Sequence, residues 1–383
     1  MKFVLAPDSF KESMTAKEVC QAMEKGIRKV LPDAEIISVP MADGGEGTTD
    51  SLIDATSGHK VTVTVTGPLG KPVQAYYGIL GDQQTAIIEM AQASGLSYVA
   101  KKDRIPSTIK KTSTFGTGEL INDALKHNVK RIIIGLGGSS TNDGGSGMAQ
   151  AIGVKFFDKN NQEITEKLGG GNLNKIANID LSHINPQIKD TEFLLASDVT
   201  NPLTGKNGAS AVFGPQKGAD EKTVQELDES LCHYAQIIQK TIDRDIAHIP
   251  GSGAAGGLGA GLLAFTNAQI HPGVKLIAHE TKLEEKIKDA DYVFTGEGGT
   301  DFQTKFGKTP FGVAQIAQKY DIPVISLAGY LGKGIDQLYD AGFTAIFGIL
   351  AKAENITQAL ADGPQNVTRT TENIVRLIVK KLR

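Results

Sequence analysis

The sequence is poor in the features that mark several large classes of protein. It has two cysteines in 383 residues, Cys20 and Cys232, and neither belongs to a C-x-x-C pair. Both are therefore interpreted as free, buried thiols in a reducing compartment. The seven histidines form neither an H-E-x-x-H motif nor a cluster with cysteine. This pattern argues against a structural zinc site.

Long hydrophobic runs and an excess of one charge are also missing. The N-terminal apolar run stops at Asp8, and the charge-free stretch around residues 251–269 is dominated by glycine and alanine. Neither is typical of a secretory signal or of a membrane span of about 20 residues. Lys and Arg number 40 against 43 Asp and Glu, which gives a formal net charge of -3. We therefore expect a cytoplasmic protein whose partners include neither nucleic acid nor a membrane.

Glycine, in contrast, is abundant. The chain has 44 glycines, clearly above the usual share of about 7%, and they gather in short clusters rather than in a G-X-Y period. With 40% hydrophobic and 22% charged residues, the composition is that of an ordinary globular protein. A chain of 383 residues is long enough for two or three domains of roughly 150 residues.

Strand and helix patterns alternate at both ends of the chain. Residues 2–6 and 35–39 are predicted strands, and Thr15 to Glu18 has the T-x-x-E form of a capping box at the start of a helix. The stretch from residue 291 onwards again alternates strands with helices. This order is typical of a parallel sheet with crossover helices. Residues 61–66 instead alternate with period two, turn residues follow at 67–72, and residues 73–80 and 86–90 are further predicted strands, which together predict an antiparallel excursion.

The predicted fold class is therefore α/β with two domains. A parallel-sheet, Rossmann-like domain built from both chain ends carries a second, mixed α/β domain as an insertion. The expected boundaries are residues 1–58, 118–195 and 286–383 for the first domain, and 59–117 and 196–285 for the inserted one. We expect the ligand site in a cleft between the two domains.

Loops that combine acids with glycines follow four predicted strands, at residues 41–47, 135–147, 197–203 and 295–301. Glycine lets backbone N–H groups approach an anion, and a following helix presents its positive end. One helix end contributes only about 0.3–1 kcal/mol, so a polyphosphate needs several such loops and a metal. Asp and Glu beside these loops suit Mg²⁺. A single loop would be interpreted as a tight turn, but four together indicate nucleotide-phosphate chemistry.

Two common phosphate-binding sequence motifs, the Walker A motif and G-x-G-x-x-G, can be compared with this sequence. A Walker A motif would need a glycine where Phe302 stands before Gly307-Lys308-Thr309, so there is no P-loop. Residues 251–256 match G-x-G-x-x-G, but residues 246–250 before them continue from a helix and not from a strand. Close packing of small residues is the favoured interpretation. A dinucleotide-dependent oxidoreductase that uses Gly251 to Gly256 stays an alternative, as does a non-catalytic small-acid-binding protein.

Taken together, the motifs resemble those of the bacterial type-1 glycerate kinase family. The matching stretches are DSFKESMTA (8–16), PMADGGEGT (40–48), GLGGSSTNDGG (135–145), SDVTNPLTGKNGA (197–209), FGPQKGA (213–219), GSGAAGGLG (251–259) and TGEGGTDFQTKFGKTPFGVA (295–314). They extend over almost the whole chain in the order of the family. Two positions depart from it: Glu12 stands where the family usually has glycine, and Gly299 where it usually has serine or arginine.

The resemblance implies ATP-dependent phosphorylation of glycerate with Mg²⁺, by two α/β domains around a cleft. Asp198 is the candidate that orients the substrate hydroxyl and takes its proton. Lys11 is expected to hold the glycerate carboxylate or to offset charge on the transferring phosphoryl group. The predicted metal ligands are Asp43, Glu297 and Asp301, with Asp43 also counted as catalytic.

Further residues are predicted to bind substrate or nucleotide. They are Asp8, Ser9, Gly44, Gly45, Gly137, Gly138, Ser139, Asn142, Asp143, Asn201, Gly256, Gly257, Gln303 and Lys308. Asn142 and Asp143 remain alternatives for the base and for the metal ligand. The sequence leaves the phosphorylated hydroxyl and the oligomeric state open.

Overall fold

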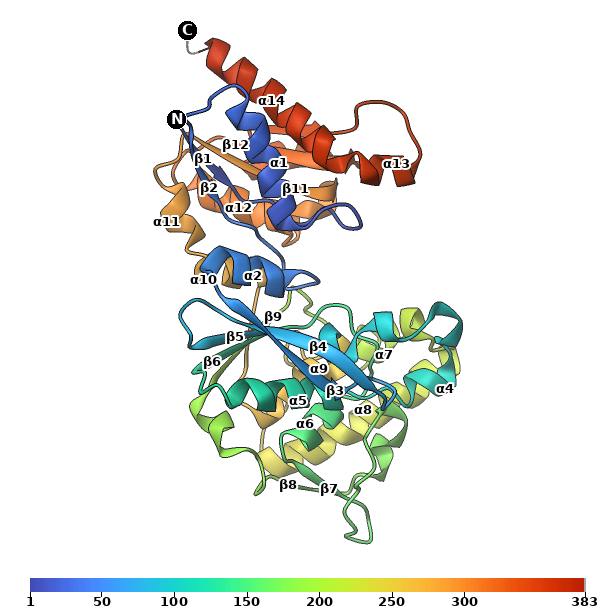
Figure 1. Ribbon diagram of the computed structural model, residues 1–383. Helices are drawn as coiled ribbons and strands as arrows, with labels where there is room; N and C mark the ends of the chain where they lie inside the picture. The colour runs from blue at the N-terminus through green and yellow to red at the C-terminus, as the bar shows by residue number, and fades with distance from the viewer. Residues whose placement is uncertain (382–383) are drawn as a thin grey trace. The chain divides into compact units, whose positions relative to one another are not determined.

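The computed structural model describes residues 1–381 and divides into two compact units (Figure 1). Unit 1 comprises Met1–Asp43, Asp50–Ser57 and the chain from Pro272 onwards, so that both chain ends contribute to it. Unit 2 comprises Gly44–Thr49 and Gly58–His271. Each unit has a sheet and a hydrophobic core of its own.

Unit 1 alternates strands and helices. Its elements are β1 (Lys2–Leu5), α1 (Ala16–Arg28), β2 (Glu35–Ser38), α2 (Thr48–Thr56, which begins in unit 2), α10 (Gly273–Glu280), α11 (Leu283–Ile287), β11 (Tyr292–Thr300), the 3-10 helix η6 (Phe302–Lys305), α12 (Thr309–Gln318), β12 (Val324–Leu331), η7 (Ile335–Ala341), β13 (Ala345–Gly348), α13 (Ile356–Ala361) and α14 (Gly363–Lys381). The predicted capping box is present at α1: the Thr15 hydroxyl accepts from the Glu18 N–H at 3.3 Å, and the Glu18 carboxylate accepts from the Thr15 N–H at 2.8 Å.

The sheet of unit 1 is parallel throughout, with the order β13-β12-β11-β1-β2. Read from the β2 edge and numbered within the unit, this is the order 2-1-3-4-5 of a doubly wound sheet. The strand that follows β1 in the chain, β2, lies on one side of β1, and β11 lies on its other side. The crevice at the carboxyl ends of β1 and β11 is therefore the place where such a sheet binds ligands.

One face of this sheet is covered by α1 and α14, which lie side by side (Figure 1). Phe3, Leu5 and Phe294 of the sheet pack with Met23 of α1 and Val375 of α14 in one buried cluster. The contact between the two helices is close, because a Cβ at Gly26 would lie 2.6 Å from the Thr368 carbonyl oxygen. The helix α12 packs against β11 and β12 outside this cluster.

Unit 2 contains the remaining elements. They are β3 (His59–Thr66), β4 (Pro72–Ile79), β5 (Thr85–Glu89), α3 (Ala91–Ser94), η1 (Leu96–Tyr98), η2 (Lys101–Asp103), α4 (Pro106–Ile109), α5 (Phe115–Leu125), β6 (Arg131–Gly135), α6 (Ser146–Ala151), β7 (Lys155–Phe157), η3 (Gly170–Lys175), β8 (Asn178–Asp180), η4 (Pro186–Asp190), β9 (Glu192–Ala196), α7 (Ala209–Phe213), η5 (Pro215–Lys217), α8 (Glu221–Ile242), α9 (Ala254–Phe265) and β10 (Gln269–His271).

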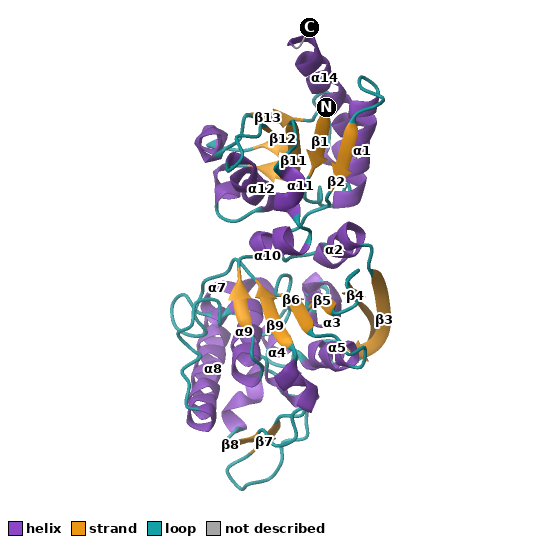
Figure 2. Cartoon of the chain, turned by 90° about the vertical axis from the view of Figure 1, so that its left-hand side faces the viewer, coloured by secondary structure: helices purple, strands orange, loops and turns teal. Residues whose placement is uncertain are grey.

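The main sheet of unit 2 has the order β10-β9-β6-β5-β4-β3 and is mixed. The strands β10, β9, β6 and β5 are parallel, whereas β4 and β3 add the antiparallel excursion that the period-two pattern predicts. Figure 2 shows these strands (orange) bordered by helices such as α5 and α9 (purple). The core is formed by the sheet with α5, α6, α8 and α9.

The division of the chain differs from the expected one in its middle part. Residues 118–195 lie in unit 2 and not in the unit that both ends build, and residues 272–285 lie in unit 1. The physical reason is strand pairing: β6 pairs with β5 and β9, so the apolar strand at residues 131–135 belongs to the mixed sheet. In addition, β11 continues to Thr300, so that the predicted acid-and-glycine loop at residues 295–301 is largely strand. Within residues 1–381, each helix is too short or too polar to cross a lipid bilayer.

Candidate active site

A cavity of about 450 Å³ lies at the carboxyl ends of the unit 1 strands. Six of the predicted site residues line it: Asp8, Ser9, Lys11, Asp43, Glu297 and Lys308. Asp8 follows β1, Asp43 follows β2, Glu297 lies in β11, and Lys308 caps α12. The doubly wound topology thus brings together residues from four separate segments of the chain, at the crevice where a ligand is expected.

Asp8 is a half-buried acid of this cavity, and both of its oxygens accept hydrogen bonds. Its Oδ2 accepts a hydrogen bond from the Thr309 hydroxyl at 2.6 Å, and its Oδ1 accepts one from the Ser9 N–H at 2.6 Å. Burial, followed by the nearby carboxylates of Asp43 and Glu297, raises the pKa of Asp8 to about 7, although the two hydrogen bonds act in the opposite direction. Three acids therefore concentrate negative charge at one end of the cavity.

Glu297 and Lys308 form the ion pair of the cavity. The Lys308 Nζ lies 2.9 Å from the Glu297 Oε2 and also donates to the Gly299 carbonyl at 3.2 Å. The Glu297 Oε1 accepts from the Thr304 hydroxyl at 2.6 Å and from the Thr300 hydroxyl at 3.3 Å. Glu297 is thus fixed on both oxygens, and it holds a partly exposed ammonium group at the cavity.

Lys11 lies on an exposed turn beside these acids. The turn closes with a hydrogen bond from the Ser13 N–H to the Phe10 carbonyl at 2.9 Å, and Glu12 adopts a left-handed φ of 63° within it. A positive φ at the third residue of a turn favours glycine. This geometry explains why the resembled family usually has glycine where this chain has Glu12.

Asp301 and Gln303 lie outside the residues that line the cavity. The Asp301 carboxylate caps η6 by accepting from the Gln303 N–H at 2.8 Å, and Gln303 itself is exposed. Among the residues that the structure describes, no three His, Cys, Asp or Glu side chains are arranged to hold a metal ion. The part predicted for Asp301 as a metal ligand stays a prediction.

In unit 2, the predicted glycine loops lie against one another. A Cβ added at Gly135 would lie 2.6 Å from the Gly44 carbonyl oxygen, and one at Gly137 would lie 3.1 Å from the Gly45 Cα. Gly44 in turn approaches Ala196 at the end of β9, with a Cβ-to-carbonyl distance of 3.1 Å. Loops that are far apart in the sequence therefore meet at the carboxyl ends of β6 and β9, close in sequence to the exposed Asp198.

Asp143 is completely buried and held by the protein itself. Its carboxylate accepts from the Thr114 N–H and hydroxyl, each at 2.7 Å, and from the N–H groups of Gly145 and Gly147 at 3.1 and 3.3 Å. Burial raises the pKa of Asp143 against these hydrogen bonds. Asn142 is equally buried and donates to the Ser210 hydroxyl at 2.9 Å. Both residues thus hold the loop in place, which weighs against their alternative roles as base or metal ligand.

Lys217, a residue of η5 that bonds to the loop at residues 135–147, is not among the site residues predicted from the sequence. Its ammonium nitrogen is buried and donates to the Ser139 Oγ and to the Thr141 carbonyl, each at 2.7 Å. Burial lowers the pKa of Lys217 to about 7, whereas the charge of Asp143 acts in the opposite direction. The available signal was its place between Pro215 and Gly218 in FGPQKGA (213–219), one of the stretches that carry the family resemblance.

The segment that matches G-x-G-x-x-G is packed against the same loop. A Cβ at Gly256 would lie 1.9 Å from the Thr141 carbonyl oxygen, and one at Gly257 would lie 2.8 Å from the Gly144 Cα. α8 and a loop precede this segment, and no strand of residues 1–381 leads into it. The glycines therefore permit close packing, as the sequence indicated. Asn201 belongs to this packing, because its carbonyl accepts from the Gly253 N–H at 3.0 Å.

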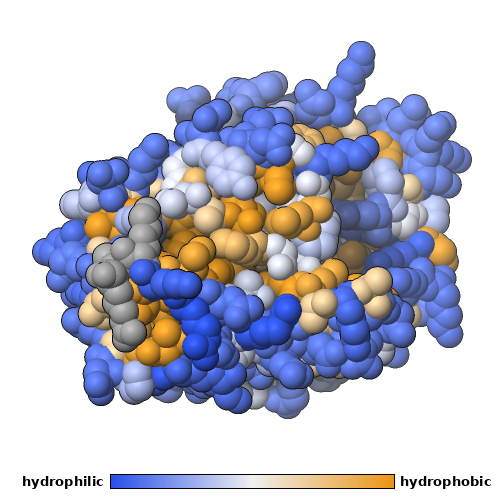
Figure 3. Space-filling model, turned by 90° about the horizontal axis from the view of Figure 1, so that it is seen from above, coloured by the Kyte–Doolittle hydropathy of each residue, from blue (hydrophilic) through white to orange (hydrophobic). Residues whose placement is uncertain are grey.

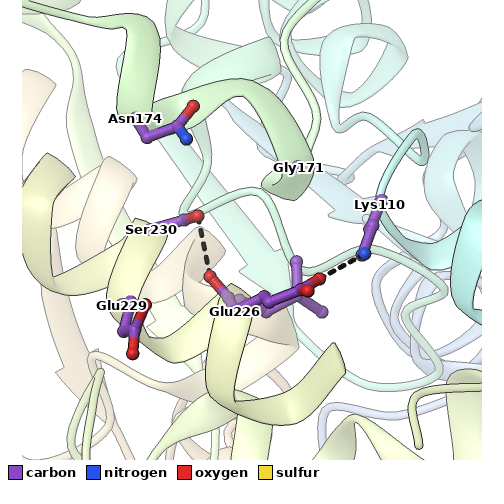
Figure 4. A pocket seen from close by; sticks show the side chains of 7 residues that line it. Lys110, Gly171, Asn174, Glu226, Glu229 and Ser230 are labelled. Carbon is purple, nitrogen blue, oxygen red and sulfur yellow. Dashed lines mark hydrogen bonds and ion pairs between the residues drawn. The ribbon is translucent and has the colours of Figure 1, made fainter. Parts of the chain in front are cut away.

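A second cavity, of about 240 Å³, lies in unit 2 beside α8 (Figure 4). Lys110 and Glu226 form an ion pair at its wall, which holds the pKa of Glu226 below its usual value, and Ser230 donates to the Glu226 carbonyl at 2.8 Å. None of the predicted site residues lines it. This cavity is therefore not the candidate active site.

Taken together, the fold and the sites define a two-unit α/β protein with a charged cavity at the switch point of a doubly wound sheet. Residues 3–379 match the sequence model described as the glycerate kinase family. The chain belongs to this family, as its motifs indicated.

Several relatives are similar over nearly their whole length. A glycerate kinase of Halalkalibacterium halodurans is 50% identical, over 97% of this chain and 96% of the relative. A glycerate 2-kinase of Escherichia coli is 48% identical, over 100% of this chain and 99% of the relative. A crystal structure described as glycerate kinase 2 of Salmonella typhimurium LT2 superposes with a TM-score of 0.90 at 45% identity, and it covers 100% of this chain and 99% of that one. The predicted α/β fold class is thereby confirmed.

Proposed function

We propose that this chain transfers the γ-phosphoryl group of ATP to a hydroxyl of glycerate, which gives phosphoglycerate and ADP. The observation that carries the proposal is the family match over residues 3–379, joined to a charged cavity in unit 1 that contains the predicted acids and lysines. Phosphoryl transfer needs little covalent chemistry from the protein, because positioning and charge neutralisation do most of the work. The use of ATP and two free cysteines support a reaction in the cytoplasm. Cys20 is buried as expected, whereas Cys232 is exposed, so the expectation of a second buried thiol is wrong.

The proposal includes Mg²⁺ held by Asp43 together with Asp8. The donor set fits the ion, because Mg²⁺ prefers oxygen ligands and usually takes one or two carboxylates, substrate phosphates and water. Asp43 is close enough to Asp8 to raise the pKa of Asp8, because one carboxylate disfavours the ionisation of the other. When bound, the ion would neutralise phosphate charge. Glu297, predicted as a ligand, is instead proposed to position Lys308.

The side chains of this chain would then do the following. Lys308, held by Glu297 at 2.9 Å, would stabilise the negative charge that moves with the phosphoryl group. Lys11 would hold the glycerate carboxylate or the transferring group. Asp198, exposed after β9, would orient the attacking hydroxyl. The backbone N–H groups of the loops at Gly44 and Gly137 would bind anionic oxygens.

For the position of transfer, we propose the 2-hydroxyl. The relative from Escherichia coli that carries the name glycerate 2-kinase is 48% identical over the full chain, which supports 2-phosphoglycerate as the product. Incubation with ATP, Mg²⁺ and D-glycerate, followed by phosphorus NMR, tests the reaction and the position together. L-glycerate serves as the matched control. Formation of 3-phosphoglycerate would overturn the position, and a lack of glycerate-dependent ADP would overturn the function.

The role of Asp198 is tested by Asp198→Asn. The variant keeps the size of the side chain but cannot take a proton, so we expect kcat to fall by about 10²–10⁴ while ATP binding, measured by calorimetry, is retained. Asp228→Asn in the same unit is the matched control, because the Asp228 carboxylate accepts from the Gly205 N–H and has no predicted part in the reaction. Normal turnover in Asp198→Asn would remove Asp198 from the chemistry.

A further inference from the structure

The charged residues line only one half of the unit 1 cavity, and large apolar residues line the other half. Tyr330, Leu350 and Ile356 line it, and they are 59%, 47% and 71% exposed. Large apolar side chains that stay this exposed beside one another usually mark a binding surface. Figure 3 shows apolar groups (orange) exposed among hydrophilic ones on the surface seen from above.

The strand order separates the two halves along the edge of the sheet. The acids come from the ends of β2, β1 and β11, whereas Tyr330 belongs to β12 and Leu350 follows β13. Adjacent strands are about 4.8 Å apart, so the positions of Asp8 and Leu350 are separated by roughly three strand spacings, or ~14 Å. A three-carbon acid cannot extend over this distance and has no apolar surface to offer. A nucleoside triphosphate has an anionic tail at one end and a flat aromatic base at the other.

The Tyr330 ring lies against the backbone of Gly299. Tyr330 pairs with Gly299 across β11 and β12, and a Cβ at Gly299 would lie 2.2 Å from the Tyr330 Cε1. The ring therefore packs directly on the glycine backbone, where any larger residue would displace it. An exposed aromatic ring that lies on a glycine backbone is a suitable platform for a nucleotide base, because every base presents a π-face to it.

We propose that the apolar half of the cavity, formed by Tyr330, Leu350 and Ile356, binds the adenine base of ATP, with the phosphates directed toward Asp8 and Lys308. This inference rests on the proposed function for the identity of the nucleotide. It assigns the nucleotide to unit 1 and makes α13 a specificity element, since Ile356 begins that helix. It also gives Gly299 a purpose, which is to leave room for the ring.

The test compares ATP with tripolyphosphate, which has the same phosphate chain and no base. Calorimetry in Mg²⁺ is carried out on Tyr330→Ala and Ile356→Ser, with Tyr330→Phe as the conservative variant. Leu377→Ser is the matched control, because Leu377 is a 69% exposed leucine of α14 that does not line the cavity. We expect the Kd for ATP to rise about tenfold in Tyr330→Ala and by a smaller factor in Ile356→Ser. Tyr330→Phe and Leu377→Ser should bind ATP as the wild type does.

Tripolyphosphate should bind all four variants as it binds the wild type. Unchanged ATP affinity in both Tyr330→Ala and Ile356→Ser would overturn the assignment, and so would an equal loss of tripolyphosphate binding. The two proposals fail separately. Active phosphorylation of glycerate with an unchanged KM for ATP in these variants would overturn the base site alone. Selective loss of ATP binding, in a protein that does not phosphorylate glycerate, would overturn the proposed function alone.

Discussion

The two units each place a lysine, an acid and several glycines near the carboxyl ends of parallel strands, but these groups face different surroundings. In unit 1, the side chain of Lys308 is 36% exposed and its ion pair with Glu297 borders a cavity. In unit 2, Lys217 and Asp143 are fully buried, and Ser139, Thr141, Thr114 and two glycine N–H groups satisfy their polar atoms.

The contrast between Lys217 and Lys308 shows how a glycine-rich polar motif with a structural role can be distinguished from one that can bind a ligand. A buried charge is tolerated only when it is well hydrogen-bonded, so the Lys217 network is a structural support that holds one loop shape. A partly exposed charge beside a cavity keeps bonding capacity for a ligand. The two motifs look equivalent in the sequence, and the discriminating observation is which partners already satisfy the charged group.

Among the variants that test this comparison between the two units, Lys308→Met should have the greatest effect. The variant removes the cation from the cavity without introducing a new polar group, so we expect kcat/KM for ATP to fall by about 10²–10³. Stability should fall by about 1–3 kcal/mol, because the buried Glu297 carboxylate loses its cation but keeps its two hydroxyl donors. Steady-state kinetics and urea unfolding measure the two quantities. Lys305→Met is the control, since this nearby lysine bonds to Gln337 outside the cavity. Equal losses in both variants would contradict the comparison.

The second prediction concerns Lys217→Met and depends on pH. The pKa of Lys217 is lowered to about 7 in the folded protein and is about 10.4 in an unfolded chain. Between these values the unfolded chain binds more protons, so the stability that depends on Lys217 rises with pH and is lost as the pH falls toward 7. The methionine variant lacks this titration.

We therefore expect the unfolding free energy of the wild type, relative to Lys217→Met, to increase between pH 7.5 and 9.5. The slope approaches about 1.4 kcal/mol per pH unit. Urea unfolding of both proteins at several pH values measures it, and titrations common to both cancel in the difference. Lys110→Met is the control, because Lys110 is partly exposed in its pair with Glu226. A difference that does not vary with pH would mean that Lys217 stays charged in the fold.

Much of the fold could be predicted because local signals decide it. The capping box at Thr15 fixes the start of α1, and the period-two pattern of residues 61–66 identifies β3 as a strand. Membership of a sheet is a different matter. The apolar run of β6 predicts a buried strand but carries no information on its partner, and its pairing with β5 moves residues 118–195 into unit 2.

The candidate site was predictable to a similar extent. Acids and lysines beside glycines indicate their chemistry by residue type, and Asp8, Asp43, Glu297 and Lys308 do line one cavity. Apolar residues at strand ends look like ordinary core, so no pattern in the sequence indicates the exposed surface around Tyr330. Burial, which separates Lys217 from Lys308, is a property of the packed chain that residue spacing does not encode.

The prediction with the least effect concerns Glu12, and it distinguishes backbone strain from charge repulsion in unit 1. Glu12 adopts a φ of 63°, which costs a non-glycine residue roughly 1–2 kcal/mol, whereas glycine loses ~0.5–1 kcal/mol through its freer unfolded chain. Glu12→Gly should therefore raise the unfolding free energy by about 0.5–1 kcal/mol, measured by urea unfolding. Glu12→Ala removes the same carboxylate but keeps the Cβ, so it should show no gain. If alanine stabilises as much as glycine, charge repulsion among the cavity acids, and not backbone strain, is what Glu12 adds to unit 1.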